Sequence, residues 1–304
     1  MTTIAVLGPG GVGGFVAAAL ARAGEDVLVI AREDTASVIA ERGIEVRSVR
    51  LGDFKAGPRV GTELTEAVDL LIVATKATTL ASALERVKEP PGLILPMLNG
   101  LDHVAALRSR YGAGRVAAAP IRIEADRPRP GVIVQTSPFL RVDVAHDDPA
   151  RRQAVEQAAA TLEQAGIPAT SDLSEAQALW SKLVRLNALA CTTSATDKPV
   201  GFIRNDPEWR ATLIACIEEA SLCANAEGAE SDPATAVAEL DAAHEGLGSS
   251  MQRDIAAGRT PELDAIPGAV LRAGARNGIP CPTIEWLSRA VAAKAGIEPP
   301  TAGS

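Results

Sequence analysis

Three glycines near the amino terminus have the types and the spacing of a phosphate-binding turn. Gly8, Gly10 and Gly13 form G-x-G-x-x-G between an apolar run at residues 4–7 and a helical pattern that ends at Gly24. The first glycine permits a tight turn, the second lets the backbone approach a pyrophosphate, and the third lets helix and strand pack closely. The helix N-terminus adds free N–H groups and a partial positive charge. We therefore expect a dinucleotide site, the alternative being a Gly-rich loop without a ligand.

The residues after the second apolar run, 27–30, bear on which dinucleotide is bound. Sites for NAD usually carry Asp or Glu at this place, bonded to the ribose 2′-hydroxyl. This chain has Arg32 instead, whose guanidinium can pair with a 2′-phosphate, and Glu33 and Asp34 follow and could serve a ribose. We favour NADPH/NADP+, and the alternative for Arg32 is a solvated arginine on a loop.

Polar residues also follow two later apolar runs. Lys76 comes directly after the run 69–74, and Asn99 follows the run 93–95. Ligands of open α/β sheets bind beyond the carboxyl ends of the strands, so both side chains could meet a cofactor or a substrate. A solvated lysine and an Asn-Gly turn at Gly100 are the alternatives.

A single lysine, Lys182, interrupts the apolar face of a helical pattern at 175–190. An ammonium near a ketone stabilises the negative charge that hydride transfer creates on oxygen, and it can donate the proton. Apolar surroundings such as Trp180 and Leu183 disfavour a charged amine and would tune it toward the working pH. The alternative is a lysine that extends along the helix edge into water.

The elements that must position these residues form an α/β pattern followed by helices alone. Strands are expected at 4–7, 27–30, 69–74 and 93–95, later strands at 116–118, 131–134 and 139–142, and a loop at 127–130. Helices dominate from Ser174 onward. The fold class is therefore α/β, with an N-terminal Rossmann-type doubly wound sheet and a C-terminal all-helical domain. The expected domains are 1–170, which binds NADP, and 171–304, which carries substrate binding and catalysis.

Composition narrows the function classes. The chain has 304 residues, of which 47% are hydrophobic and 22% charged, as in globular proteins able to bury sizeable cores. Its net charge of −8 argues against nucleic acid as a partner. Four cysteines and three histidines lack metal-ligand spacing, so no metal is expected. With neither a signal peptide nor a membrane-spanning run, we expect a cytoplasmic protein. The alanine-rich helices of the second half fit either a homodimer interface or an internal core.

Motifs spread along nearly the whole chain form a set. They are Gly8-Pro9-Gly10-Gly11-Val12-Gly13-Gly14, Ala31-Arg32, Ala74-Thr75-Lys76, Leu98-Asn99-Gly100, Leu179-Trp180-Ser181-Lys182-Leu183, Ser249-Ser250-Met251-Gln252-Arg253-Asp254-Ile255 and Thr260-Pro261-Glu262-Leu263-Asp264. Together these segments resemble the ketopantoate reductase family. The glycine turn is shared with many dehydrogenases, whereas the segments 249–255 and 260–264, with their spacing, are specific to the family.

The resemblance implies reduction of a 2-keto acid by NADPH to a 2-hydroxy acid such as pantoate. It implies that Lys182 is the general acid, that Glu262 supports this lysine and the cofactor, and that Asn99 and Ser250 hold the substrate. Residues implied to line the NADPH site are Gly8, Pro9, Gly10, Gly11, Val12, Gly13, Arg32, Lys76, Asn99 and Glu262.

The chain departs from the family pattern in two places. Many members carry asparagines four and eight residues after the lysine, where this chain has Leu186 and Ala190. Asn187, five residues after the lysine, is the candidate to replace them in substrate binding, but it lies about 140° around the helix from Lys182. Pro267 replaces a frequent asparagine, and a proline should kink the helix expected over 260–278.

These departures leave the substrate open. The main hypothesis is an NADPH-dependent 2-dehydropantoate reductase acting in pantothenate biosynthesis. A less polar pocket would also suit a different, bulkier 2-keto acid. A dinucleotide-binding sensor without turnover is the third hypothesis, and the set Lys182, Ser250 and Glu262 argues against it.

Overall fold

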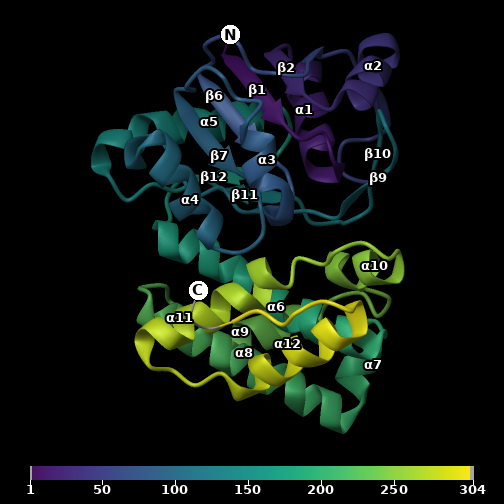
Figure 1. Ribbon diagram of the computed structural model, residues 1–304, viewed down its shortest axis with the longest axis vertical. Helices are drawn as coiled ribbons and strands as arrows, with labels where there is room; N and C mark the ends of the chain where they lie inside the picture. Colours follow the sequence, from purple (N-terminus) through teal and green to yellow (C-terminus); the bar gives the residue numbers. More distant parts are fainter. Residues whose placement is uncertain (1, 302–304) are drawn as a thin grey trace. The chain divides into compact units, whose positions relative to one another are not determined.

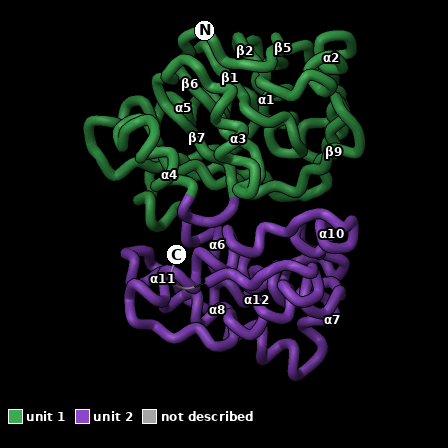
Figure 2. The backbone as a smooth tube through the Cα atoms, viewed as in Figure 1, with its two compact units in different colours: residues 1–98, 103–178 green, residues 99–102, 179–304 purple. Residues whose placement is uncertain are grey.

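The computed structural model describes residues 2–301, which form two compact units. Unit 1 comprises residues 1–98 and 103–178, and unit 2 comprises residues 99–102 and 179–304 (Figure 2). The short segment 99–102 is thus an excursion of the chain out of unit 1. Over the described residues, none of the helices combines the length and the apolar character needed to cross a membrane.

A five-stranded sheet in which all neighbouring strands are parallel organises unit 1 (Figure 1). Four of its strands are short, mainly apolar runs buried on both faces, as expected for parallel strands covered by helices. The fifth, Arg59–Gly61 at the edge, is exposed or half-buried. The sheet order is β5 (Arg59–Gly61), β2 (Asp26–Ile30), β1 (Thr3–Leu7), β6 (Leu70–Val73) and β7 (Leu93–Pro96).

Helices and two smaller sheets complete unit 1. The core packs aromatic and branched side chains of the first helix, such as Phe15 and Leu20, against the central strands. The helices are α1 (Gly11–Arg22), α2 (Glu33–Arg42), α3 (Leu80–Leu84), α4 (Asp102–Tyr111, whose first residue lies in unit 2) and α5 (Arg152–Gln164), with short 3-10 turns η1 (Ala77–Thr79), η2 (Ala113–Arg115) and η3 (Pro149–Arg151). The second sheet has the order β4 (Phe54–Ala56), β3 (Ile44–Ser48), β10 (Val132–Gln135) and β9 (Ala125–Arg129), and the third β12 (Ala169–Thr170), β11 (Arg141–Asp143) and β8 (Ile121–Arg122).

Two expected segments of unit 1 differ from the structure. The sequence predicts a loop over 127–130, but β9 occupies 125–129 and pairs with β10 across a bulge. Its polar, proline-containing sequence suits an exposed edge, where the pairing partner rather than local preference makes the strand. Residues 116–118 form only isolated bridges, to Ile94 and Ala145, instead of a strand.

Unit 2 is helical, which confirms the expected class of a Rossmann-type sheet followed by a helical domain. Its long helices pack around fully buried side chains that include Trp180, Leu213 and Ile284. The helices are α6 (Glu175–Thr196, whose first residues lie in unit 1), α7 (Val200–Asn205), α8 (Pro207–Ala226), α9 (Pro233–Asp241), α10 (Ser250–Ala256), the π turn η4 (Asp264–Gly268), α11 (Ala269–Asn277) and α12 (Pro282–Ala295).

Pro267 explains the π turn ahead of α11. Proline has no N–H, so it cannot bond the carbonyl four residues earlier, which belongs to Leu263. The next residue, Gly268, donates its N–H to that oxygen instead, at 3.2 Å. This wider turn inserts one extra residue, as in the π-bulges that are frequent at functional sites. The helix expected over 260–278 thus begins only at Asp264, and the expected kink at Pro267 takes the form of a π turn.

Candidate functional site

The glycine turn of unit 1 has the geometry that phosphate binding requires. Gly8 has a φ of +91°, which glycine adopts without strain. A Cβ on Gly13 would lie 2.2 Å from the Gly8 carbonyl oxygen, so only glycine allows this approach of α1 to β1. A Cβ on Gly10 would meet nothing within 4 Å, which leaves open space beside the backbone.

The N-terminus of α1 is available to an anion. Gly10 is the N-cap, and no side chain caps the helix there. Gly11 is fixed by a different contact, since a Cβ on it would come within 2.1 Å of the Ala125 carbonyl oxygen. An uncapped helix terminus, an open approach and a tight turn fit the pyrophosphate of a dinucleotide.

The other two cofactor candidates of unit 1 lie just after parallel strands. Arg32 is exposed at the N-cap of α2, two residues beyond the end of β2. Glu33 and Asp34 occupy the first turn of the same helix. Lys76 is half-buried at the N-cap of η1, shortly after β6. Both cations therefore lie at the carboxyl edge of the sheet, where ligands of this fold bind.

In unit 2, hydrogen bonds bring together three predicted residues that are far apart in the chain. The Lys182 Nζ donates to the Asn99 Oδ1 at 2.9 Å, and the Asn99 Nδ2 donates to the Glu262 Oε2 at 2.9 Å. An ammonium can only donate and a carboxylate can only accept, so both bonds are satisfied by one orientation of the amide. Asn99 is therefore an oriented link: its amide, held in one orientation, connects the Lys182 ammonium with the Glu262 carboxylate.

Three different elements supply this Lys182–Asn99–Glu262 chain. Lys182 projects from α6, whose neighbouring Trp180 and Leu183 are buried. Asn99 lies in the excursion 99–102, and Glu262 precedes the π turn with 8% of its surface exposed. A charged carboxyl group so enclosed requires hydrogen-bond donors, and the Asn99 amide is one of them.

The other two substrate-binding candidates lie elsewhere in unit 2. Ser250 is exposed at the first residue of α10, whereas its neighbour Ser249 is buried and caps that helix by accepting from the Gln252 N–H. Asn187 is fully buried among the helices. Its amide donates to the Cys216 Sγ at 3.3 Å and accepts from the Cys191 Sγ at 3.5 Å. In the structure, the Asn187 amide therefore bonds to two cysteines of the helical core, and its assignment to substrate binding stays a prediction.

The buried thiol of Cys191 is expected to make the free energy of unfolding fall as the pH rises into the alkaline range. Burial raises the pKa of its thiol to about 12. Unfolded cysteine ionises near ~8.5, so the folded chain holds an extra proton between these values and the free energy of unfolding falls as pH rises through them. We expect Cys191→Ala to flatten this fall by up to about 1.4 kcal/mol per pH unit. Urea unfolding of both proteins from about pH 8 to about pH 11 measures it, and parallel curves would contradict it.

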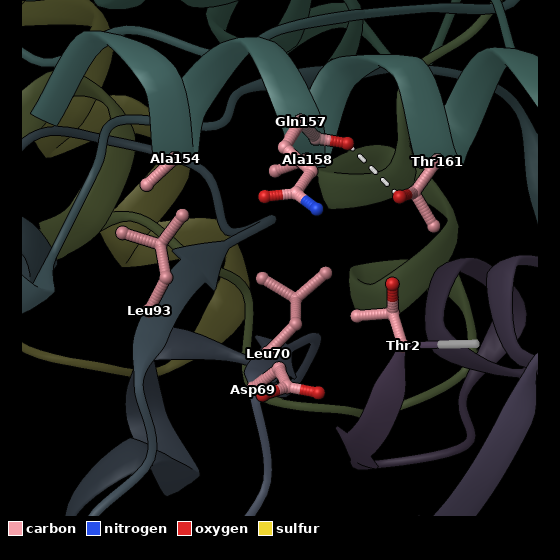
Figure 3. Close-up of a pocket in the computed structure, with 8 residues that line it drawn as sticks. All are labelled: Thr2, Asp69, Leu70, Leu93, Ala154, Gln157, Ala158 and Thr161. Atoms are coloured by element: carbon pink, nitrogen blue, oxygen red, sulfur yellow. Dashed lines mark hydrogen bonds between the residues drawn. The ribbon is translucent and has the colours of Figure 1, made fainter.

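A pocket at the opposite edge of the sheet of unit 1 carries none of this chemistry. It lies between α5 and the amino ends of the strands (Figure 3), and its volume is about 290 Å³. Its polar groups include Asp69, which accepts from Thr3, and Thr161, whose hydroxyl donates to the Gln157 carbonyl oxygen. Ligands of open α/β sheets bind at the carboxyl ends instead. We therefore place the candidate site at the residues described above.

Comparison with known proteins identifies the family. Residues 4–145 match the family model "Ketopantoate reductase PanE/ApbA", and residues 176–295 match the model of its C-terminal domain. A 2-dehydropantoate 2-reductase of Caulobacter vibrioides is 32% identical over 291 residues, which cover 93% of this chain and 95% of that relative.

Solved structures share the architecture. The crystal structure of 2-dehydropantoate 2-reductase from Geobacter metallireducens superposes with a TM-score of 0.88 at 27% identity, covering 95% of this chain and 98% of that one. A D-mandelate dehydrogenase solved with NADH and anilino(oxo)acetate has a TM-score of 0.87 at 21% identity, over 97% and 100% of the two chains, and shows a shared fold. The chain therefore belongs to the ketopantoate reductase family and is an oxidoreductase that reduces a 2-keto acid.

Proposed function

We propose that this protein catalyses the NADPH-dependent reduction of 2-dehydropantoate to pantoate, a step of pantothenate biosynthesis. The observation that carries the proposal is the hydrogen-bonded chain from Lys182 through Asn99 to Glu262. In a chain that belongs to a reductase family, this hydrogen-bonded chain holds the Lys182 ammonium through the Asn99 amide, which is itself oriented by the Glu262 carboxylate. Relatives that are named 2-dehydropantoate 2-reductase and align with 93% and 96% of this chain support this substrate.

The reaction needs a hydride and a proton. NADPH, when bound, supplies the hydride to the keto carbon. Lys182 stabilises the negative charge that develops on the keto oxygen and donates the proton from Nζ, so that the product is a 2-hydroxy acid. The lysine then regains a proton from solvent.

The remaining residues orient Lys182 or bind the substrate and the cofactor. Glu262 accepts from the Asn99 amide and thereby turns the Asn99 oxygen toward the ammonium. We assign Asn99 and Ser250 to substrate binding, and Glu262 and Asn99 also to the nicotinamide side of the cofactor. Lys182 is then preorganised before the charge develops, which is the condition for effective electrostatic stabilisation.

The cofactor proposal assigns the pyrophosphate to the turn 8–13 and the 2′-phosphate to Arg32, with Lys76 as a second cation. The exposed position of Arg32 after β2 supports it. We expect Arg32→Ala to lower kcat/KM with NADPH about 10- to 100-fold, the loss of a charge-assisted contact to phosphate, and to leave NADH unchanged. Parallel steady-state assays with both cofactors measure this. Equal losses with both cofactors would remove Arg32 from the 2′-phosphate site.

A different 2-keto acid is the second candidate substrate. The observation that favours it is the apolar replacement at Leu186, Ala190 and Pro267, where the family often carries asparagine. A panel of 2-keto acids with aliphatic and aromatic side chains, compared by kcat/KM, separates the candidates. The proposal expects 2-dehydropantoate to lead the panel, and an aromatic keto acid in first place would replace it as the substrate.

A cytoplasmic location and a homodimer complete the proposal. Exposed apolar side chains on the helices of unit 2, among them Leu222 and Trp286, support an association of two copies. Sedimentation equilibrium of the purified chain tests the dimer.

A further inference from the structure

A buried arginine joins the two segments that hold the Asn99–Glu262 hydrogen bond. Arg272 lies on α11 with 9% of its side chain exposed. Its Nη2 donates to the Asp102 Oδ2 at 2.7 Å, and its Nη1 donates to the Asp264 Oδ1 at 2.8 Å. Asp102 lies three residues after Asn99, and Asp264 lies two residues after Glu262. One guanidinium therefore spans the same two segments that the Asn99–Glu262 bond spans.

The backbones of the two segments also approach each other closely next to the Arg272 contacts. Gly100 has a φ of +85°, and a Cβ on it would come within 2.0 Å of the Ala265 carbonyl oxygen in the π turn. The Arg272 Nη2 also donates to the Asp264 carbonyl oxygen at 2.9 Å. Arg272 thus bonds to both the backbone carbonyl and the side-chain carboxylate of Asp264 in the π turn.

The electrostatics of Arg272 fit a fixed link. Burial by itself lowers the pKa of Arg272, but the hydrogen bonds to Asp264 and Asp102 raise it above its ordinary value. A buried charge that loses its partner is costly, so the guanidinium strongly favours the arrangement in which both carboxylates are in reach. Arginine also offers its donors in a rigid planar fork, which lysine does not.

We propose that Arg272 is a positioning residue for the reduction: by clamping Asp102 and Asp264, it sets the distance between Asn99 and Glu262 and thereby the orientation of the Lys182 ammonium. The catalytic consequence rests on the proposed function, whereas the geometric consequence for Lys182 does not. An error of about 1 Å in the placement of a reacting group can cost on the order of 100-fold in rate.

The test uses two variants of the clamp in the full chain. Asp102→Asn removes the charge on the Asn99 side at a half-exposed position, and Arg272→Lys keeps the charge but loses the fork. Arg210→Met is the matched control, because Arg210 forms a bidentate ion pair with Asp241 in the same unit, far in sequence from the site.

The first readout is the acetylation rate of Lys182 by acetic anhydride, mapped by mass spectrometry against the exposed Lys55 as internal standard. Loss of the hydrogen bond to Asn99 removes one contact of the Lys182 amine and alters its orientation, so both clamp variants should change this rate about three- to tenfold. Arg210→Met should leave it unchanged. This readout needs no substrate and is interpretable even if 2-dehydropantoate is not turned over.

The second readout is the split between kcat and KM at a temperature well below the thermal midpoint of each variant. We expect both clamp variants to lower kcat about 10- to 100-fold with a much smaller change in the KM for NADPH, most of whose proposed contacts lie on unit 1. Lys182 acetylation at the wild-type rate in both variants overturns the clamp. Changed acetylation with a wild-type enzyme that reduces no 2-dehydropantoate supports the clamp and contradicts the proposed substrate. Changed acetylation with unchanged kcat overturns the catalytic part of the inference.

Discussion

Lys182→Ala is expected to lower kcat for the 2-keto acid by about 10²- to 10⁴-fold, the usual contribution of a positioned proton donor. The variant loses both the proton and the positive charge that the keto oxygen requires. NADPH affinity should stay at the wild-type value, because the phosphate-binding turn belongs to unit 1. Stopped-flow turnover and fluorescence titration with NADPH measure the two quantities separately.

Two further variants sharpen this prediction. Lys182→Arg keeps a positive charge that cannot release its proton at neutral pH, so its kcat should stay low if proton donation is required. Lys198→Ala removes an exposed lysine of the same unit and should behave as wild type. Near-wild-type turnover by Lys182→Ala would show that another group protonates the oxygen.

Asn99→Asp is expected to lower kcat about 100-fold at neutral pH with almost no change in side-chain volume. The wild-type Nδ2 donates to Glu262, and the aspartate would place a second carboxylate at that position. Two carboxylates in contact cannot both ionise easily, so the pair takes up a proton and its upper pKa rises. The link then no longer has the one orientation that serves both Lys182 and Glu262.

The pH dependence distinguishes this effect from a simple packing defect. Below the raised pKa the shared proton restores a donor between the two carboxyl groups, so the kcat of Asn99→Asp should recover as pH falls. The ratio of wild-type to variant kcat should therefore grow with pH. A ratio that stays constant across the pH range would contradict the role of Asn99 as an oriented link.

The parts of this molecule that sequence analysis predicted are those that local chemistry determines. The turn Gly8–Gly13 lies between a buried strand and a helix. The positive φ of Gly8 and the approach of Gly13 to the Gly8 carbonyl oxygen require glycine, whereas Gly10 borders open space. The displacement of Asn187 from Lys182 also follows from helix geometry alone. Strand β9 could not be predicted, because its polar residues become a strand only through pairing with β10.

The connection among the site residues lies beyond such reasoning. Asn99 is 83 residues from Lys182 and 163 from Glu262, and nothing in the local pattern pairs them. Family resemblance indicated that Glu262 supports the lysine, and the structure shows Asn99 bonded to both. Arg272 was missed, although a lone arginine on the apolar side of a short helix was a visible signal. Its partners Asp102 and Asp264 become apparent only once the chain is folded.

The most direct test of the central claim is the consumption of NADPH by the purified wild-type chain with 2-dehydropantoate, with the product identified by mass spectrometry. The account predicts rapid, stoichiometric conversion of NADPH and 2-dehydropantoate into NADP+ and pantoate, and much slower conversion with NADH. Tight NADPH binding without consumption in the presence of 2-dehydropantoate would contradict it and leave the family and the fold with another 2-keto acid as substrate.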